Sequence, residues 1–95
     1  MMRSKDLVQA LAALANETRL AICKALLRMG PDGIPSHELA DRMCLSRTLA
    51  SHHLRILVQA GIVEQRRSGR VLRHSLVGPQ VRALAEAIEK LAPTE

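Results

Sequence analysis

Five side chains between residues 47 and 55 are of the types that bind nucleic acids. Each carries a hydrogen-bond donor suited to phosphate oxygens or base edges, and no carboxylate lies among them: Arg47, Thr48, Ser51, His52 and Arg55. On a helix, their spacing places all five on one side. The alternative is a solvated helix face, but such a face usually mixes charges of both signs, and this one does not. The pattern therefore favours DNA recognition.

The segment that must position these side chains, residues 36–57, has the pattern of two short helices joined by a tight corner. Apolar residues recur at helical spacing in both halves: Leu39, Ala40 and Met43, then Ala50, Leu54 and Leu57. We expect Ser36 and Ser46 to cap the two helix N-termini, with the corner at Cys44. Helix, corner and helix are typical of the helix-turn-helix motif, whose second helix enters the major groove of DNA.

Residues 62–76 have the pattern of a β-hairpin. Two strand-like runs are separated by Ser68-Gly69, a suitable hairpin turn, and Arg66, Arg67 and Arg70 lie around its tip. A basic hairpin directly after a recognition helix is typical of a winged helix-turn-helix, and in that case we expect these arginines to reach the adjacent minor groove or backbone. The alternative is a basic edge hairpin that only resists association with other strands.

Three further helices are expected, over residues 5–15, 17–29 and 79–91. The first and last carry more apolar surface than packing on a small core needs, so we expect them to form a dimer interface. The second, capped by Asn16, has an almost wholly apolar surface and is the expected core helix. The predicted buried stripes are Leu7, Leu11, Leu14 and Ala15; Leu20, Ile22, Cys23, Leu26 and Leu27; and Val81, Leu84, Ala85, Ile88 and Leu91.

Length and composition agree with a single small domain over residues 1–95. The chain has 14 Lys and Arg against 9 Asp and Glu, a net charge of +5, which suits an anionic partner. It contains no Phe, Tyr or Trp, which disfavours a platform that stacks single-stranded bases and favours an oligomer that covers an aliphatic core. Two cysteines, no apolar stretch of membrane-spanning length and no signal-type N-terminus predict a reduced, cytoplasmic protein.

Taken in order, several pieces of the chain resemble the ArsR/SmtB family of bacterial repressors. They are LANETRL at 14–20, ELA at 38–40, LS at 45–46, SHHL at 51–54, Leu57, AGIV at 60–63 and RSGR at 67–70. The resemblance implies a mainly α, homodimeric winged helix-turn-helix repressor with the order α-α-α-α-β-β-α. It also implies a palindromic operator that is released when a metal, metalloid or oxidant binds. By position, the five residues named first fall on the recognition helix and Arg70 on the wing.

The sensing motifs of that family are missing. Residues 34–38 lack a Cys-x-Cys pair, residues 81–91 hold no His, Asp or Cys, and no cysteines cluster near residue 95. Cys23 lies near the first thiol of the two-cysteine redox members, but the second is absent, and we expect Cys23 to be inert packing. We therefore predict no cofactor, although a metal or metalloid inducer stays open.

Cys44 replaces the glycine that the family more often has at the corner, so we expect a left-handed backbone there. It is either a small apolar filler or a thiol whose oxidation or metallation alters the recognition helix, with His37, His52 and His53 near it in sequence. We expect His53 to face inward in a structural role. His74 has no predicted role.

The sequence thus predicts a dimeric, sequence-specific DNA-binding regulator, most simply a repressor. The alternative is a winged-helix module for protein–protein interaction, which gives no reason for the uniformly cationic outer face. An enzyme is disfavoured, because the chain has neither a glycine-rich phosphate loop nor a nucleophile with its base at recognisable spacing.

Overall fold

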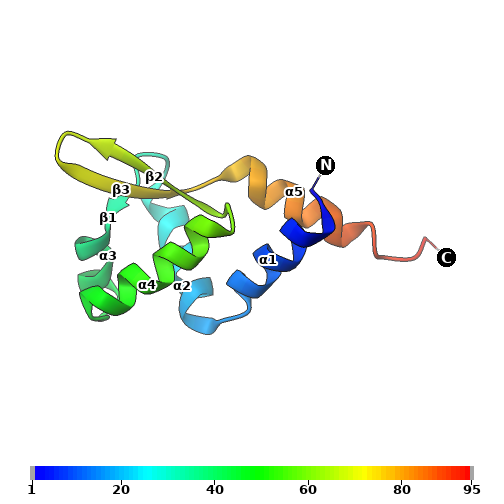
Figure 1. The fold of residues 1–95 in the computed structure, drawn as a ribbon, viewed down its shortest axis with the longest axis horizontal. Helices are drawn as coiled ribbons and strands as arrows, with labels where there is room; N and C mark the ends of the chain where they lie inside the picture. Colours follow the sequence, from blue (N-terminus) through cyan, green and yellow to red (C-terminus); the bar gives the residue numbers. More distant parts are fainter. Residues whose placement is uncertain (1, 95) are drawn as a thin grey trace.

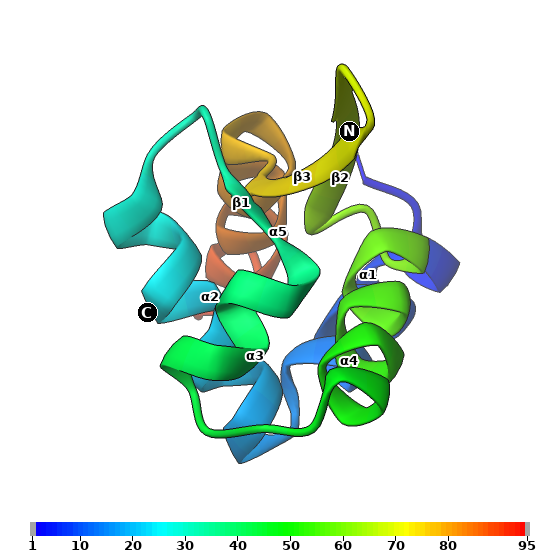
Figure 2. The same cartoon turned by 90° about the vertical axis from the view of Figure 1, so that its left-hand side faces the viewer.

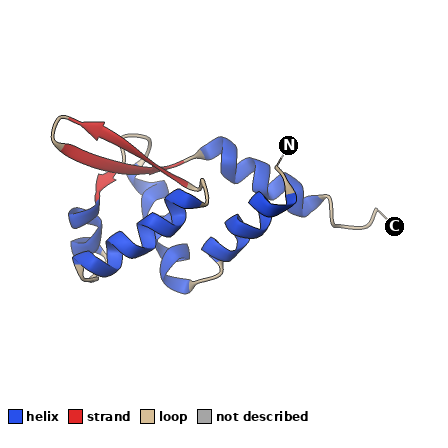
Figure 3. Cartoon of the chain, viewed as in Figure 1, coloured by secondary structure: helices blue, strands red, loops and turns tan. Residues whose placement is uncertain are grey.

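The computed structural model describes residues 2–94, and within them the predicted order of helices and strands is confirmed (Figures 1 and 3). The elements are α1 (Ser4–Leu14), α2 (Glu17–Met29), β1 (Ile34–Pro35), α3 (Ser36–Arg42), α4 (Arg47–Gln59), β2 (Val63–Ser68), β3 (Val71–Leu76) and α5 (Gly78–Glu89). The hairpin lies at one end of an elongated body, and α5 extends toward the other end (Figure 1).

The hairpin belongs to a three-stranded antiparallel sheet of order β1-β3-β2, rather than being a two-stranded unit. β1 is only two residues long and pairs with β3, Ile34 opposite His74. Between β2 and β3, Ser68 pairs with Val71, so the loop is Gly69-Arg70 and not Ser68-Gly69 as the sequence suggested. Gly69 has a φ of +64°, as the first position of a tight two-residue loop requires.

Two of the three predicted helix caps are confirmed. The side chain of Asn16 accepts the backbone N–H of Arg19 at 3.0 Å, and that of Ser46 accepts the N–H of Leu49 at 3.0 Å. The predicted cap at Ser36 is wrong, because α3 already begins at Ser36 and makes no side-chain cap. Pro35, paired in β1, keeps the backbone extended up to the residue before the helix.

The corner after α3 is a Schellman turn with a cysteine in the left-handed position. The N–H of Leu45 donates to the carbonyl of Ala40 at 2.9 Å, and that of Cys44 donates to Asp41 at 3.3 Å. Cys44 has a φ of 56°, and in the described part of the chain it is the one residue other than glycine with positive φ. The predicted left-handed corner is confirmed.

The end of α4 repeats this turn with a glycine. The N–H of Ile62 donates to Leu57 at 3.0 Å, the N–H of Gly61 donates to Val58 at 3.0 Å, and Gly61 has a φ of 78°. The turn at Cys44 sets the direction in which α4 begins, and the turn at Gly61 sets the direction in which the chain enters the β2–β3 hairpin.

The core is aliphatic, as expected, and lies among α2, α3, α4 and the sheet, with smaller contributions from α1 and α5. Its largest fully buried side chains are Ile22, Leu26, Ile34, Leu39, Leu54, Leu57, Ile62 and Val63. The predicted burial of α2 is partly wrong: Leu20 and Leu27 are 44% and 72% exposed, and Cys23 is half-buried. A helix on the outside of a small domain buries one face, and here that face is the one with Ile22 and Leu26.

The outer helices also bury narrower stripes than predicted. In α1 the buried residues are Ala10 and Ala13, whereas Leu11 is 41% exposed and Ala15 is exposed. In α5 only Leu84 is buried; the predicted stripe members Val81, Ala85, Ile88 and Leu91 are exposed, and the helix ends at Glu89. α1 and α5 lie side by side (Figure 1), and several of their large apolar side chains are exposed.

Candidate nucleic-acid interface

The outer face of α4 has the composition that the sequence predicts. Ala50, His53, Leu54 and Leu57 turn inward and are buried. The five predicted contact residues are all exposed: Arg47, Thr48, Ser51, His52 and Arg55. Because α4 contains no carboxylate, this face presents only neutral or positive donors.

Leu49 also lies exposed on α4, at 42%, and is not among the contact residues predicted from the sequence. The sequence pattern could have predicted this exposure, because position 49 lies outside the stripe of apolar residues that faces the core. A leucine among donors supplies the apolar contact that a thymine methyl group takes in the major groove.

Partly buried contacts of the Arg19 side chain link α4 to α1 and α2. The guanidinium of Arg19 contacts Nδ1 of His53 at 3.2 Å through Nη1, and its Nε donates to the carbonyl of Ala13 at 2.6 Å. Burial lowers the pKa of His53, and the positive charges of Arg19 and His52 lower it further. The neutral ring then accepts from Arg19, which confirms the inward, structural role predicted for His53.

The strand period sorts the wing arginines onto two faces of the hairpin. Arg67, opposite Leu72, lies on the face that Gln65 and His74 share toward α4. Arg66 lies on the other face, opposite Arg73, and its guanidinium meets Glu64 at 3.3 Å between exposed side chains. Arg70 lies exposed in the loop at the tip. The three wing residues are thus all accessible but do not form one patch.

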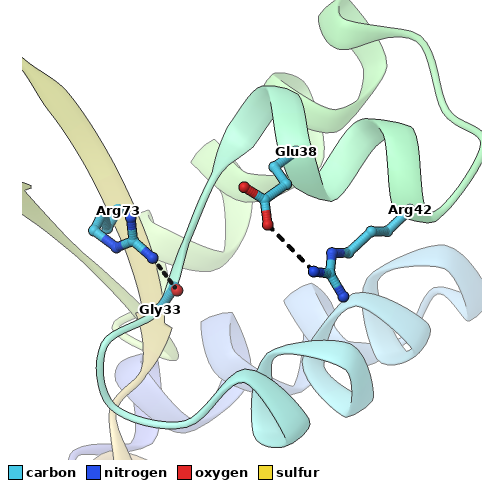
Figure 4. Close-up of polar contacts among 4 residues, drawn as sticks. All are labelled: Gly33, Glu38, Arg42 and Arg73. Carbon is cyan, nitrogen blue, oxygen red and sulfur yellow. Dashed lines mark hydrogen bonds and ion pairs between the residues drawn. The ribbon is translucent and has the colours of Figure 1, made fainter.

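A fourth arginine of the hairpin, Arg73 on β3, has a structural role. Its Nε donates to the carbonyl of Asp32 at 2.9 Å and its Nη2 to that of Gly33 at 3.0 Å (Figure 4). These bonds tie β3 to the loop after α2. Gly33 packs so closely that a Cβ there would meet the backbone of His74.

A crevice of about 210 Å³ separates α4 from the wing. Ser51 and Arg55 line one side of it, and Gln65 and His74 line the other. His74 is 4% exposed, burial lowers its pKa, and its Nε2 lies 3.2 Å from the amide nitrogen of Gln65. A neutral His74 accepts that amide proton, so this histidine, for which the sequence predicted no role, orients a wing side chain beside the recognition helix.

The two cysteines differ in accessibility, and both are free thiols. Cys23 is half-buried, and burial raises its pKa to about 11, which favours the protonated thiol over the reactive thiolate. Cys44 is exposed, so its interpretation as an apolar filler is wrong. Within residues 2–94, no three His, Cys, Asp or Glu side chains gather closely enough to hold a metal ion.

Known proteins share this architecture. A family model described as a helix-turn-helix domain matches residues 14–66. The transcriptional activator HlyU of Vibrio cholerae is 33% identical over 88 residues, which cover 93% of this chain and 79% of HlyU. An ArsR-like transcriptional regulator from Rhodococcus superposes with a TM-score of 0.81 at 31% identity, covering 92% of this chain and 79% of that one. The chain belongs to the ArsR/SmtB family.

Another similar solved structure is Mb0332 of Mycobacterium bovis, described as the homodimeric winged helix-turn-helix DNA-binding domain of a possible ArsR-family transcriptional regulator. It superposes with a TM-score of 0.75 at 26% identity, covering 92% of this chain and 79% of that one. Membership makes this chain a transcriptional regulator of the winged-helix type, in a family without enzymatic activity. In the described residues, no helix is long and apolar enough to cross a membrane.

Proposed function

We propose that this chain is a homodimeric repressor that binds a palindromic operator and acts in the cytoplasm. In each protomer α4 lies in a major groove, and the β2–β3 hairpin contacts the flanking minor groove or backbone. The observation that carries the proposal is the exposed, carboxylate-free outer face of α4, held in place by the Ser46 cap and the Arg19–His53 tie.

The surface of α1 and α5 supports the dimer. Five apolar side chains stand exposed on or just after these two neighbouring helices: Val8, Leu11, Val81, Ile88 and Leu91. Val8 and Leu91 are 65% and 76% exposed, which is unfavourable for a lone small domain that has no aromatic side chains to enlarge its core. The homodimeric state described for the Mycobacterium bovis relative supports the same assembly.

The test is binding of the purified protein to DNA from upstream of its own gene, over a series of salt concentrations. We expect a steep fall of affinity with salt, because several phosphates are neutralised in each protomer. Arg47→Ala should cost about 1–3 kcal/mol and relax preference at one base position. Arg28→Ala, an exposed arginine on α2 outside both proposed surfaces, is the matched control and should bind like the wild type.

An equal loss for Arg47→Ala on every DNA sequence would make Arg47 a phosphate contact. No specific binding at low salt would refute the operator proposal and favour the protein-interaction module.

Release from the operator is proposed to occur through the thiol of Cys44, because it is exposed at the corner that leads into α4. We expect an oxidant to weaken operator binding and a reductant to restore it. Cys44→Ser should abolish this response, whereas Cys23→Ser, at a half-buried thiol, should keep it. The same assay with As(III), Zn(II) or Cd(II) tests a metal or metalloid inducer, and indifference to all treatments would refute a thiol switch.

A further inference from the structure

A groove of about 570 Å³ lies between α2 and the C-terminal end of α3. None of its lining residues belongs to α1, α4, the β2–β3 hairpin or α5. The surfaces proposed for the dimer and for the operator therefore leave it open. Figure 2 shows α3 between α2 and α4, so the groove approaches the helix-turn-helix from the side away from the recognition helix.

The floor of the groove is apolar. Ala21 and Ala25 lie one turn apart on α2, and the groove is open above them because their side chains are small. Met29 and Met43 also line it, and both are half-buried. Methionine is flexible and polarisable, so it adapts to apolar side chains of different shapes. This floor suits hydrocarbon and gives a lone phosphate or metal ion nothing to bind.

The rim of the groove is cationic. Lys24, Arg28 and Arg42 line it, and no carboxylate does. Glu38 meets Arg42 at 3.3 Å (Figure 4), but both side chains are about half exposed, and such a pair contributes little. Arg28 and Arg42 lie in the last turns of their helices, where the helix dipole favours a positive charge. The helix dipole accounts for the positive charge of Arg28 and Arg42, but it does not account for the apolar groove that these two residues and Lys24 line together.

We infer that this groove binds an acidic amphipathic helix of another protein. Apolar side chains at helical spacing occupy the floor, and carboxylates beside them face the cationic rim. The phosphates of DNA would bind the cationic rim but would leave the apolar floor empty. An apolar floor together with a cationic rim therefore favours a protein segment over DNA. Because Met43 immediately precedes Cys44, a bound helix contacts the corner from which α4 starts.

Two synthetic 15-residue peptides test the inference. One carries Leu at i, i+4 and i+7 with Glu at the flanking positions, and the other has Gln in place of every Glu. The protein is labelled with ¹³C on its methionine methyl groups. We expect saturable shifts of the Met29 and Met43 signals with the acidic peptide, no shift of Met2, and binding about tenfold weaker for the Gln peptide. Unmoved Met29 and Met43 signals, or equal binding of both peptides, would overturn the inference.

Charge-reversed variants separate the groove from general electrostatics. Lys24→Glu/Arg28→Glu should weaken binding of the acidic peptide at least about tenfold. Lys5→Glu/Lys90→Glu changes the net charge equally, on exposed residues outside the groove, and should bind the peptide like the wild type. All four positions are exposed, so none of the substitutions disturbs the core. A parallel loss of operator affinity in the groove variant alone would show that the rim contacts DNA, and it would overturn the assignment to a protein partner.

Discussion

Replacing Cys44 with glycine should stabilise the protein. The cysteine has a φ of 56°, its side chain is exposed, and the turn uses only its backbone. A left-handed conformation costs a residue with a Cβ about 1–2 kcal/mol. The greater freedom of glycine in the unfolded chain offsets about 0.4–1 kcal/mol of that relief. The net expected gain in the free energy of unfolding is about 0.5–1 kcal/mol, or roughly 2–8 °C in Tm for a domain of this size.

The assay is urea denaturation followed by far-ultraviolet circular dichroism, because the chain has no aromatic side chain for fluorescence. Variants are compared at equal protein concentration, since association adds to apparent stability. Cys44→Ala removes the thiol but keeps the Cβ, so its stability should stay within about 0.5 kcal/mol of the wild type. Gly61→Ala places a Cβ in the equivalent turn, where φ is 78°, and should lose stability. A Cys44→Gly protein no more stable than Cys44→Ala would refute the strain argument.

Two further outcomes are expected. Gly33→Ala should lower the free energy of unfolding by about 1–3 kcal/mol more than Gly30→Ala does. Both glycines have positive φ, but only a Cβ at position 33 would clash with the backbone of His74, and equal losses in urea titrations would exclude that clash. Stability should fall as the pH drops through about 6.5. The folded state lowers the pKa values of His53 and His74, so over this range the unfolded chain binds protons at these histidines more readily than the folded chain does. His53→Gln and His74→Gln should each flatten this fall in denaturation titrations between about pH 7.5 and pH 5.5, and an unchanged slope would contradict it.

Features set by local chemistry were predictable from the sequence. The caps at Asn16 and Ser46 follow from side chains that satisfy free N–H groups, and α2 has the predicted bounds. The break in the apolar period located the corner at Cys44, whereas its left-handed backbone was expected from the glycine that the family more often has at this position. The outward face of α4 was found for a similar reason, since a 3.6-residue period fixes which side chains share a side once the inward stripe is known.

Features set by distant partners were not predictable in this way. An apolar stripe does not reveal which neighbour covers it, so Leu27 and Leu91 were expected to be buried and are exposed. In the sequence, Arg73 resembles the other arginines of the wing. Its structural role depends on loop carbonyls about 40 residues away in sequence, which only the folded structure brings next to it. The role of His74 likewise depends on Gln65 across the hairpin, a pairing that the strand register alone determines.

The contacts of Arg19 have a consequence for how two half-sites are read together. One guanidinium binds the carbonyl of Ala13, near the end of α1, and the ring of His53, in the middle of α4. It therefore joins the helix proposed to hold the dimer to the helix proposed to enter DNA. A dimer reads a palindrome only if its two recognition helices stay about 34 Å apart, one turn of the duplex. In the proposed dimer, this arginine helps to fix the distance between the two recognition helices. Loss of Arg19 should therefore impair cooperative occupation of the two half-sites more than contact with either one.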